Sequence, residues 1–526
     1  MKKFFRNLMS GNIVFITLLL LEVIVVLYLQ FGLDDLVNRI FGLEENAESG
    51  QAIILLIYMI LRIIGFIIAV IIFFKIINKE EDPEFKIPWI VGMLLLPFFF
   101  SIMFIIFGNH GLRKQDRLIV KATRNAYHAH FNLSEETKLD MGHAAGTFCY
   151  LNSTTEVGPH VNNRVTYYKT GEEFFPELLS SLKQAKEFIF MEFFIISDGV
   201  YWTEVKNTLI EKVKEGVEVR LIYDDMGCSG TIASNTARAL RKIGIKCYKF
   251  HPFRPILSGV YNNRDHRKIV VIDHQMAFTG GMNLADEYGN VIKRFGYWKD
   301  TMIKVEGSAI NNLITIFLQN FDLAAGEVSD YNKYLMYDYP KYDDDGYVMP
   351  FGDGPGGIDD ALIGEQTYIN ILNYARYEVF ISTPYLVPTY GLIDALRNAA
   401  LRGVKVHLIV PGIPDKKLVY KVAEYNFRYL LDAGVNIYRY TPGFNHMKTI
   451  LADERLAMVG TINFDFRSLV HHFECGTVLY RNHCAKDILD DFKQMLEVSE
   501  KVPSNFKLNK RTKRFCALIK LISPLL

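Results

Sequence analysis

Two short stretches of the sequence share one arrangement of residues that can carry out acid–base and phosphate chemistry. In each, a histidine is followed by a lysine two positions later and by an aspartate seven positions later: His266, Lys268 and Asp273, and then His446, Lys448 and Asp453. An asparagine follows at the same distance in both stretches, Asn283 in the first and Asn463 in the second. A single histidine–lysine pair is most often surface decoration, whereas two copies with equal spacing favour a functional role.

The chemistry that these residues predict is the making and breaking of a phosphodiester. Residues two apart on a strand point to the same face, so each histidine and its lysine project together. If the two copies meet about a pseudo-twofold axis, the lysines and asparagines can hold the phosphate oxygens where charge develops. One imidazole can attack phosphorus while the other protonates the leaving alcohol. This scheme needs no metal ion or other cofactor, and the sequence offers no clear carboxylate–histidine ligand set.

The elements that must position these motifs are duplicated as well. Three pairs of segments match between the two halves of the chain: 185–194 with 375–385, 216–222 with 403–409, and 244–250 with 434–440. Each contains a short β-branched or aromatic run that follows a helical pattern, and each segment of the second and third pairs begins with a glycine. Alternating strands and helices with short connections predict an α/β fold with a mostly parallel sheet in each half.

Composition limits the class of protein. The chain has 526 residues, too many for one core, and half of them are hydrophobic. The apolar excess lies in the first 108 residues. A net charge of +1 gives no global field for nucleic acid. The six cysteines form no C-x-x-C pair, which argues against a zinc site or a disulfide framework and favours a reducing, cytosol-facing catalytic region.

Three apolar segments, at residues 13–31, 52–74 and 87–107, are each near the length that crosses a bilayer as a helix. A signal peptide is the disfavoured alternative for the first, because no small-residue cleavage site follows it. Glu22 and Arg62 lie near the centres of the first two segments; either they pair, or the first segment lies at the interface and Glu22 is hydrated. Basic residues flank the region at both ends, so the number of spans stays open.

The remaining segments define the expected organisation. The acidic stretches 34–48 and 343–360 are expected to be solvated loops. A basic cluster at 507–514 followed by an apolar end predicts an interfacial element attracted to anionic lipid, or else a disordered tail. We expect a transmembrane region, a linker, a first domain, an acidic linker, a second domain and a tail at residues 1–110, 111–160, 161–325, 326–355, 356–500 and 501–526.

At these motifs the sequence resembles the phospholipase D superfamily, and in particular its bacterial cardiolipin synthase branch. The resemblance covers nearly the whole chain and extends to these residues: 163–165, 171–175, Glu192, 223–227, 295–300, 383–385, 463–468 and Glu474. It implies two duplicated phospholipase D-like α/β/α sandwich domains, packed pseudo-symmetrically and preceded by transmembrane helices.

The resemblance also implies a reaction. One phosphatidylglycerol would donate its phosphatidyl group to a histidine and release glycerol, and a second would take the group and become cardiolipin. His266 would be the nucleophile and His446 the acid, although the two could be exchanged. A hydrolase or transphosphatidylase that uses water or another alcohol is the alternative. A nuclease and a non-catalytic lipid-binding scaffold are disfavoured, the first by the membrane segments and the second by the complete motifs.

Members of the superfamily place a carboxylate behind each histidine, and the matching positions are Asp300 for His266 and Glu474 for His446. The two motif aspartates are expected to be structural hydrogen-bond acceptors in the motif turns. His472 stands where the family usually has asparagine, and three apolar segments stand where two are common. The implied partners are phosphatidylglycerol and anionic membrane lipid, without nucleic acid. The implied location is the bacterial cell membrane, in a multi-pass arrangement with cytoplasmic catalytic domains; the oligomeric state stays open.

Overall fold

The computed structural model describes residues 48–108, 111–127, 133–252, 262–344, 346–355 and 361–522. These residues form two units that divide near residue 109. The first is a small helical unit and the second holds both motif-bearing halves together.

The N-terminal unit consists of α4 (Glu48–Ile77), α5 (Pro83–Leu95) and α6 (Pro97–Phe107). The third apolar segment was expected to form one helix, and this prediction is wrong. The helix breaks at Leu96, whose φ and ψ are −139° and 77°, because Pro97 has no N–H and disfavours helical geometry in the residue before it. The two short helices pack on α4 around Trp89 and Phe104.

Within the described residues, no helix combines the length and the apolar character needed to cross a membrane. Arg62 lies in α4, whereas the first apolar segment and Glu22 lie outside the described residues.

The first half of the larger unit builds a seven-stranded sheet in the order β1-β8-β6-β5-β2-β3-β4. Its elements are β1 (Arg164–Tyr168), α10 (Gly171–Gln184), β2 (Phe188–Phe193), α11 (Val200–Lys214), β3 (Glu218–Asp224), α12 (Thr236–Lys242), β4 (Lys246–Phe250), β5 (Lys268–Ile272), β6 (Met276–Gly280), β8 (Met302–Glu306) and α13 (Ile310–Ala325). A short strand, β7 (Tyr297–Lys299), pairs outside this sheet.

The second half repeats this order, with the sheet β19-β13-β12-β10-β15-β16-β18-β9. Its elements are β9 (Tyr347–Asp353), α14 (Ile363–Tyr374), β10 (Glu378–Ser382), α15 (Tyr390–Leu401), β12 (Lys405–Pro411), α16 (Lys417–Leu431), β13 (Asn436–Tyr440), β14 (Gly443–Asn445), β15 (Thr449–Ala452), β16 (Leu456–Gly460), β18 (Glu474–Tyr480), α17 (Cys484–Glu497) and β19 (Ser499–Lys501). Each of the first ten elements of the first half has a counterpart, so the duplication seen in the sequence extends to the fold.

Both sheets are mixed, which corrects the expectation of a mostly parallel sheet. In the first sheet β2–β3 and β3–β4 are parallel, and the other neighbouring strands are antiparallel. The turn at the end of each motif explains why the sheets are mixed. After β5 and β15 the chain reverses in a tight turn at Asp273 and at Asp453, both of which have φ of +50°, so a hairpin replaces the expected crossover helix.

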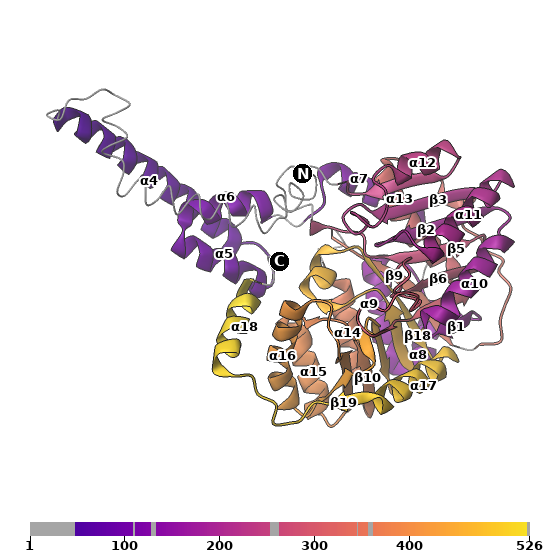
Figure 1. Ribbon diagram of the computed structural model, residues 1–526. Coiled ribbons are helices and arrows are strands. Elements are labelled where there is room, and N and C mark those ends of the chain that lie inside the picture. The colour runs from indigo at the N-terminus through magenta and orange to yellow at the C-terminus, as the bar shows by residue number, and fades with distance from the viewer. Residues whose placement is uncertain are drawn as a thin grey trace. The chain divides into compact units, whose positions relative to one another are not determined.

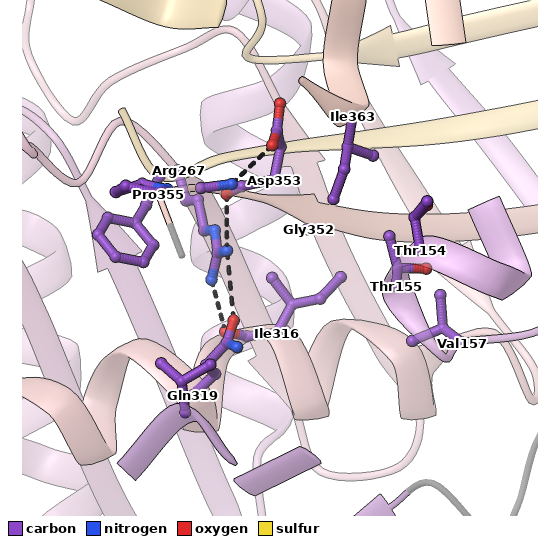
Figure 2. Close-up of a pocket in the computed structure, with 13 residues that line it drawn as sticks. Thr154, Thr155, Val157, Arg267, Ile316, Gln319, Gly352, Asp353, Pro355 and Ile363 are labelled. Atoms are coloured by element: carbon purple, nitrogen blue, oxygen red, sulfur yellow. Dashed lines mark hydrogen bonds between the residues drawn. The ribbon is translucent and has the colours of Figure 1, made fainter. Parts of the chain in front are cut away.

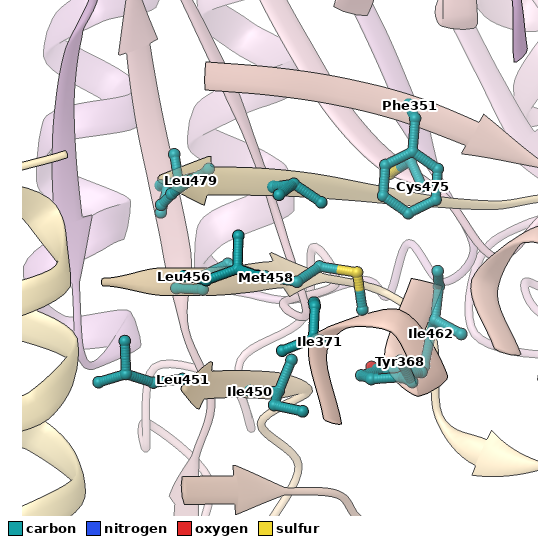
Figure 3. Packing of buried hydrophobic residues seen from close by; sticks show 14 of the residues in the cluster. Phe351, Tyr368, Ile371, Ile450, Leu451, Leu456, Met458, Ile462, Cys475 and Leu479 are labelled. Atoms are coloured by element: carbon teal, nitrogen blue, oxygen red, sulfur yellow. The ribbon is translucent and has the colours of Figure 1, made fainter. Parts of the chain in front are cut away.

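Helices cover both faces of each sheet (Figure 1). Along β2, Ile189 and Met191 pack with α10–α12, whereas Phe188 and Phe190 face α13, as strand alternation requires. The core on the α13 side continues into the second half, where Met458 packs among Phe351, Ile371 and Leu479 (Figure 3). One continuous core therefore fixes the two halves against each other.

Two segments expected to be linkers contain ordered structure. Residues 111–160 form α7 (Lys114–Tyr127), α8 (Glu135–Met141) and α9 (Ala145–Thr155), and α9 packs against β9. The last part of the acidic linker is β9 itself, a buried edge strand, so the prediction of a solvated loop there is wrong. Its acidic residues are bound: Asp344 accepts from the Asn482 amide, and Asp353 accepts from two backbone N–H groups.

The basic tail forms a helix, α18 (Lys510–Ile522), which packs on α16 through the buried Cys516. Phe515 and Leu518 remain 51% and 65% exposed on the same helix. The described part of the tail is thus an amphipathic helix and not a disordered segment.

Candidate active site

The four basic side chains of the two motifs gather in one nearly buried group. Lys268 begins β5, and Lys448 immediately precedes β15, so each histidine stands just before a central strand of its sheet. His266 and His446 are each 6% exposed, and the lysines are essentially buried. Burial is the main cause that lowers the pKa of His266, and the charges of Lys268 and Lys448 lower it further, so the lysines of both motifs act on this histidine.

Backbone hydrogen bonds cross between the halves at the motifs. The N–H of His266 donates to the carbonyl of Phe473 at 2.8 Å, and the N–H of His446 donates to the carbonyl of Lys299 at 2.7 Å. Phe473 directly precedes Glu474, and Lys299 directly precedes Asp300. Each motif is therefore held against the segment of the other half that carries a carboxylate.

The carboxylates cross in the same way. Nδ1 of His266 lies 2.9 Å from Oε2 of Glu474, and Nδ1 of His446 lies 2.6 Å from Oδ2 of Asp300. The pairing expected from the sequence, Asp300 with His266 and Glu474 with His446, is wrong. The backbone hydrogen bonds between the two halves bring each carboxylate to the histidine of the other half. Nδ1–H donation to a carboxylate leaves Nε2 of each ring free to react.

The two carboxylates have different surroundings. Glu474 accepts hydrogen bonds from the hydroxyls of Thr461 and Ser468. Asp300 instead lies against Gly281, where an added Cβ would stand 2.0 Å from Oδ1 of the aspartate. Burial raises the pKa of Asp300 to about 6. The glycine of the first motif is thus needed to make room for the carboxylate, whereas Thr461 at the matching position of the second motif donates to one.

Burial and like charge together keep the imidazoles neutral in the free enzyme. Burial is the largest cause that lowers the pKa of His266 and of His446, and the motif lysines lower both pKa values further. Burial also lowers the pKa of Lys268 to about 8 and that of Lys448 to about 7. Nζ of Lys448 lies 2.7 Å from Nδ1 of His446. The lysines are therefore cations that lose their charge within the range of ordinary assays.

This predicts an alkaline loss of activity. A lysine is charged below its pKa, so kcat/KM, which reports the free enzyme, is expected to fall as the pH rises through 7 to 8. Lys448→Arg should move the onset of this alkaline limb to higher pH, because a guanidinium stays charged, and Lys268→Arg should make the fall above pH 8 less steep. The check is a pH profile of kcat/KM for each variant; an alkaline limb that stays in place in both would contradict the assignment.

The motif aspartates lie at the far ends of their strands from the histidines. Asp273 accepts from the backbone N–H groups of Lys186, Glu187 and Phe188 at 2.7–2.8 Å. Asp453 binds the matching three, those of Arg376, Tyr377 and Glu378. These contacts agree with the structural role expected for both aspartates, since each one fixes the start of the neighbouring strand.

Asp273→Ala is expected to lower the free energy of unfolding by about 2 kcal/mol, since buried N–H groups lose their acceptor. Asp273→Asn retains one acceptor oxygen and should lose less. Thermal unfolding of both variants measures the effect. If Asp273→Ala unfolded like the wild type yet had no activity, the aspartate would have a chemical role instead.

The two motif asparagines differ. Asn283 accepts from the backbone N–H of Ile195 and donates to the Tyr288 hydroxyl, so its amide is already bound to the protein on both sides. Oδ1 of Asn463 has no hydrogen bond within the described part of the chain. Of the two neutral donors expected for the phosphate, Asn463 has the freer amide, because oxygen and nitrogen of such a group can be exchanged by a flip.

Several residues around the histidines were not predicted as site residues. Tyr288 places its ring 5.5 Å from that of His446. Lys416, just before α16, contributes a charge that lowers the pKa of both histidines. Ser468 lies inside a segment that the family resemblance includes, and Thr461 lies two residues before that segment. Lys416 belongs to no motif, and the sequence carries no signal for it.

A third imidazole lies beside His266. The ring of His472 is 5.4 Å from that of His266, centre to centre, and its Nδ1 lies 3.4 Å from Oε1 of Glu474. Glu474 therefore faces two histidines, one on each oxygen.

Behind the motif, Arg267 ties the halves together (Figure 2). Its guanidinium donates to the backbone carbonyls of Ile316 and Asp353 at 2.9 and 3.0 Å, as Figure 2 shows. It also donates to the backbone carbonyl of Glu474 at 2.9 Å. A cavity of about 40 Å³ adjoins it, room for about one water molecule. The described residues that line this cavity include none of the motif histidines or lysines, so it is separate from the candidate active site.

The chain is similar to several known proteins. The family described as "cardiolipin synthase, PLD-like domain" matches residues 178–293 and 368–496. An uncharacterized protein of Streptococcus mutans is 42% identical over 86% of this chain and 98% of its own. Cardiolipin synthase 2 of Bacillus cereus is 33% identical over 88% of this chain and 90% of its own. Phosphatidylserine synthase of Haemophilus influenzae shares the fold, with a TM-score of 0.56 and 15% identity over 73% of this chain and all of its own.

Proposed function

This chain belongs to the cardiolipin synthase family of PLD-like enzymes, which makes it a phosphatidyltransferase, and we propose that it joins two phosphatidylglycerol molecules into cardiolipin with release of glycerol. The observation that carries the proposal is the crossed pair of histidines, each backed by a carboxylate of the other half and accompanied by a lysine. Such a group can make one phosphorus–nitrogen bond and break it again without a change in the protein.

In the first step, Nε2 of His266 attacks the phosphorus of the donor lipid. Lys268 and Lys448 bind the non-bridging oxygens, on which negative charge increases in the transition state. The bond from phosphorus to the glycerol oxygen breaks, and His446 gives that oxygen a proton. The negative phosphodiester and Asp300 both favour a protonated His446, which offsets the low pKa of this histidine in the free enzyme.

In the second step, His446 takes the proton from a glycerol hydroxyl of another phosphatidylglycerol. That oxygen attacks phosphorus, the phosphorus–nitrogen bond breaks, and His266 is regenerated. Water at the same place would give phosphatidic acid instead. The imidazole side chains are 7% and 8% exposed, and this near closure supports an acceptor supplied by a bound lipid over bulk water.

We propose that the enzyme works at the bacterial cell membrane with its catalytic halves on the cytoplasmic side. Both substrates are lipids in this scheme, so the reacting groups must meet a lipid surface. The α18 helix supports such contact, because it exposes Phe515 and Leu518 and carries Lys510, Arg511, Lys513 and Arg514. Apolar side chains flanked by basic ones favour anionic lipid.

The test is product analysis with the purified enzyme and vesicles of phosphatidylglycerol alone. We expect cardiolipin and glycerol in equal amounts by mass spectrometry. Phosphatidic acid as the main product would overturn the transfer reaction and leave a hydrolase. Adding a short-chain alcohol to the same vesicles shows whether another acceptor can replace the second lipid.

A further inference from the structure

Three side chains next to the proposed nucleophile form a ligand set that the sequence did not reveal. His266, His472 and Glu474 each place one metal-binding atom within 4.8 Å of the others. Nδ1 of His266 lies 2.9 Å from Oε2 of Glu474, and Nδ1 of His472 lies 3.4 Å from Oε1, the other oxygen of the same carboxylate. In a tetrahedral zinc site with bonds of about 2.0–2.1 Å, neighbouring ligand atoms lie about 3.3 Å apart. We infer that His266, His472 and Glu474 bind a divalent transition-metal ion such as zinc, and that the bound ion switches the enzyme off.

The three groups are held in place before any ion arrives. The hydroxyls of Thr461 and Ser468 fix the carboxylate of Glu474. The backbone N–H of His472 donates to the carbonyl of Arg467 at 3.0 Å. Hydrogen bonds that orient the ligands from behind are typical of metal sites in proteins.

His472 supplies an independent observation. Its side chain is only 10% exposed, and its Nδ1 makes no well-formed hydrogen bond within the described part of the chain. At 3.4 Å from Oε1 of Glu474, this nearly buried nitrogen has only a poorly formed contact, which is costly. A shared cation would satisfy both atoms.

The donor set also selects the kind of ion. Two imidazole nitrogens and one carboxylate oxygen suit zinc, cobalt, nickel and copper, whereas magnesium and calcium prefer oxygen ligands. The ammonium groups of Lys268 and Lys448 lie near enough to interact with Glu474, so they oppose a further cation. We therefore expect reversible binding, weaker than at a dedicated structural zinc site.

Inhibition follows from the position of one proton. In the hydrogen-bonded form, Nδ1 of His266 carries the proton that faces Glu474, and Nε2 holds the lone pair for attack. Coordination uses the lone pair of Nδ1, so this proton moves to Nε2 and none is released. An Nε2–H group cannot attack phosphorus. This consequence rests on the proposed role of His266, whereas the binding of the ion does not.

Binding is tested on the full-length enzyme with Co²⁺ as the probe. We expect one equivalent to give the visible absorption of a four- or five-coordinate cobalt site, and Zn²⁺ to remove it while Mg²⁺ does not. His472→Asn should abolish the absorption. His407→Asn is the matched control, because His407 forms another histidine–glutamate pair, at 3.0 Å from Glu378, outside the site. His472→Gln replaces His472→Asn if thermal unfolding shows that the latter is not folded.

The activity arm measures the Zn²⁺ concentration that halves product formation. We expect it to rise at least tenfold in His472→Asn and to stay unchanged in His407→Asn. A cobalt spectrum that is absent in the wild type, or equally strong in His472→Asn, would overturn the site. Binding without loss of activity would overturn the switch. The cobalt spectra of the wild type and of His472→Asn do not depend on which lipid the enzyme makes. A failure of the metal site can therefore be distinguished from a failure of the proposed function.

Discussion

His446→Asn is expected to release one equivalent of nitrophenol from a phosphatidyl p-nitrophenol ester and then to stop. The first step with this lipid needs no acid, because nitrophenolate leaves without a proton. The second step still needs His446 as the base, so the phosphatidyl group should remain on His266. With phosphatidylglycerol, where the leaving alkoxide needs a proton, the same variant should lose about 10²–10⁴-fold in rate.

His266→Asn should show no burst with either lipid, since no nucleophile remains to receive the phosphatidyl group. Rapid mixing with absorbance detection gives the burst, and mass spectrometry of the stopped His446→Asn protein locates the added group. If the two variants exchanged their behaviour, the roles of His266 and His446 would be reversed. If both gave full bursts, histidine would not be the nucleophile.

Much of the fold was readable because the information is local or repeated. The H-x-K spacing predicts a strand at each motif, and the structure has matching central strands there, although His266 lies two residues before β5 and His446 three residues before β15. The mixed sheets were missed because a single turn residue decides strand direction: Asp273 adopts φ of +50° and reverses the chain. Spacing alone does not distinguish that hairpin from a crossover.

The acidic linker was misread for a different reason. Asp344 and Asp353 suggest a solvated loop by composition, yet both side chains are nearly buried and hydrogen-bonded. Between them, β9 pairs along its whole length with β18, more than a hundred residues later in the chain. Long-range pairing of this kind overrides local composition.

The crossed carboxylates lay beyond sequence reasoning altogether. Glu474 reaches His266 across 208 residues, and Asp300 reaches His446 across 146. Each carboxylate follows its own half's motif at a similar distance, so a pairing within each half looked equally natural. The backbone contacts of Phe473 and Lys299 with the opposite motif decide the matter.

That crossing gives the second large effect. Glu474→Gln should resemble His266→Asn and lose the nitrophenol burst, because a carboxamide can donate to Nδ1 of His266 and leave the proton on Nε2. The comparable change behind the histidine of a serine-protease triad costs about 10⁴-fold. Asp300→Asn should instead resemble His446→Asn, keep the burst and fail in turnover, since the imidazolium at His446 loses its counter-charge.

The two variants discriminate sharply between the pairings. If each carboxylate served the histidine of its own half, Asp300→Asn would lose the burst and Glu474→Gln would keep it. Asp353→Asn is the matched control: it removes another buried carboxylate, one bound to backbone N–H groups outside the histidine pair, and should leave the burst intact once its folding has been checked by thermal unfolding.

Because Glu474 and Asp300 come from different halves, the outcome also reports whether one half alone could be active. The crossed arrangement predicts that it could not, since each histidine would lack the group that sets its tautomer.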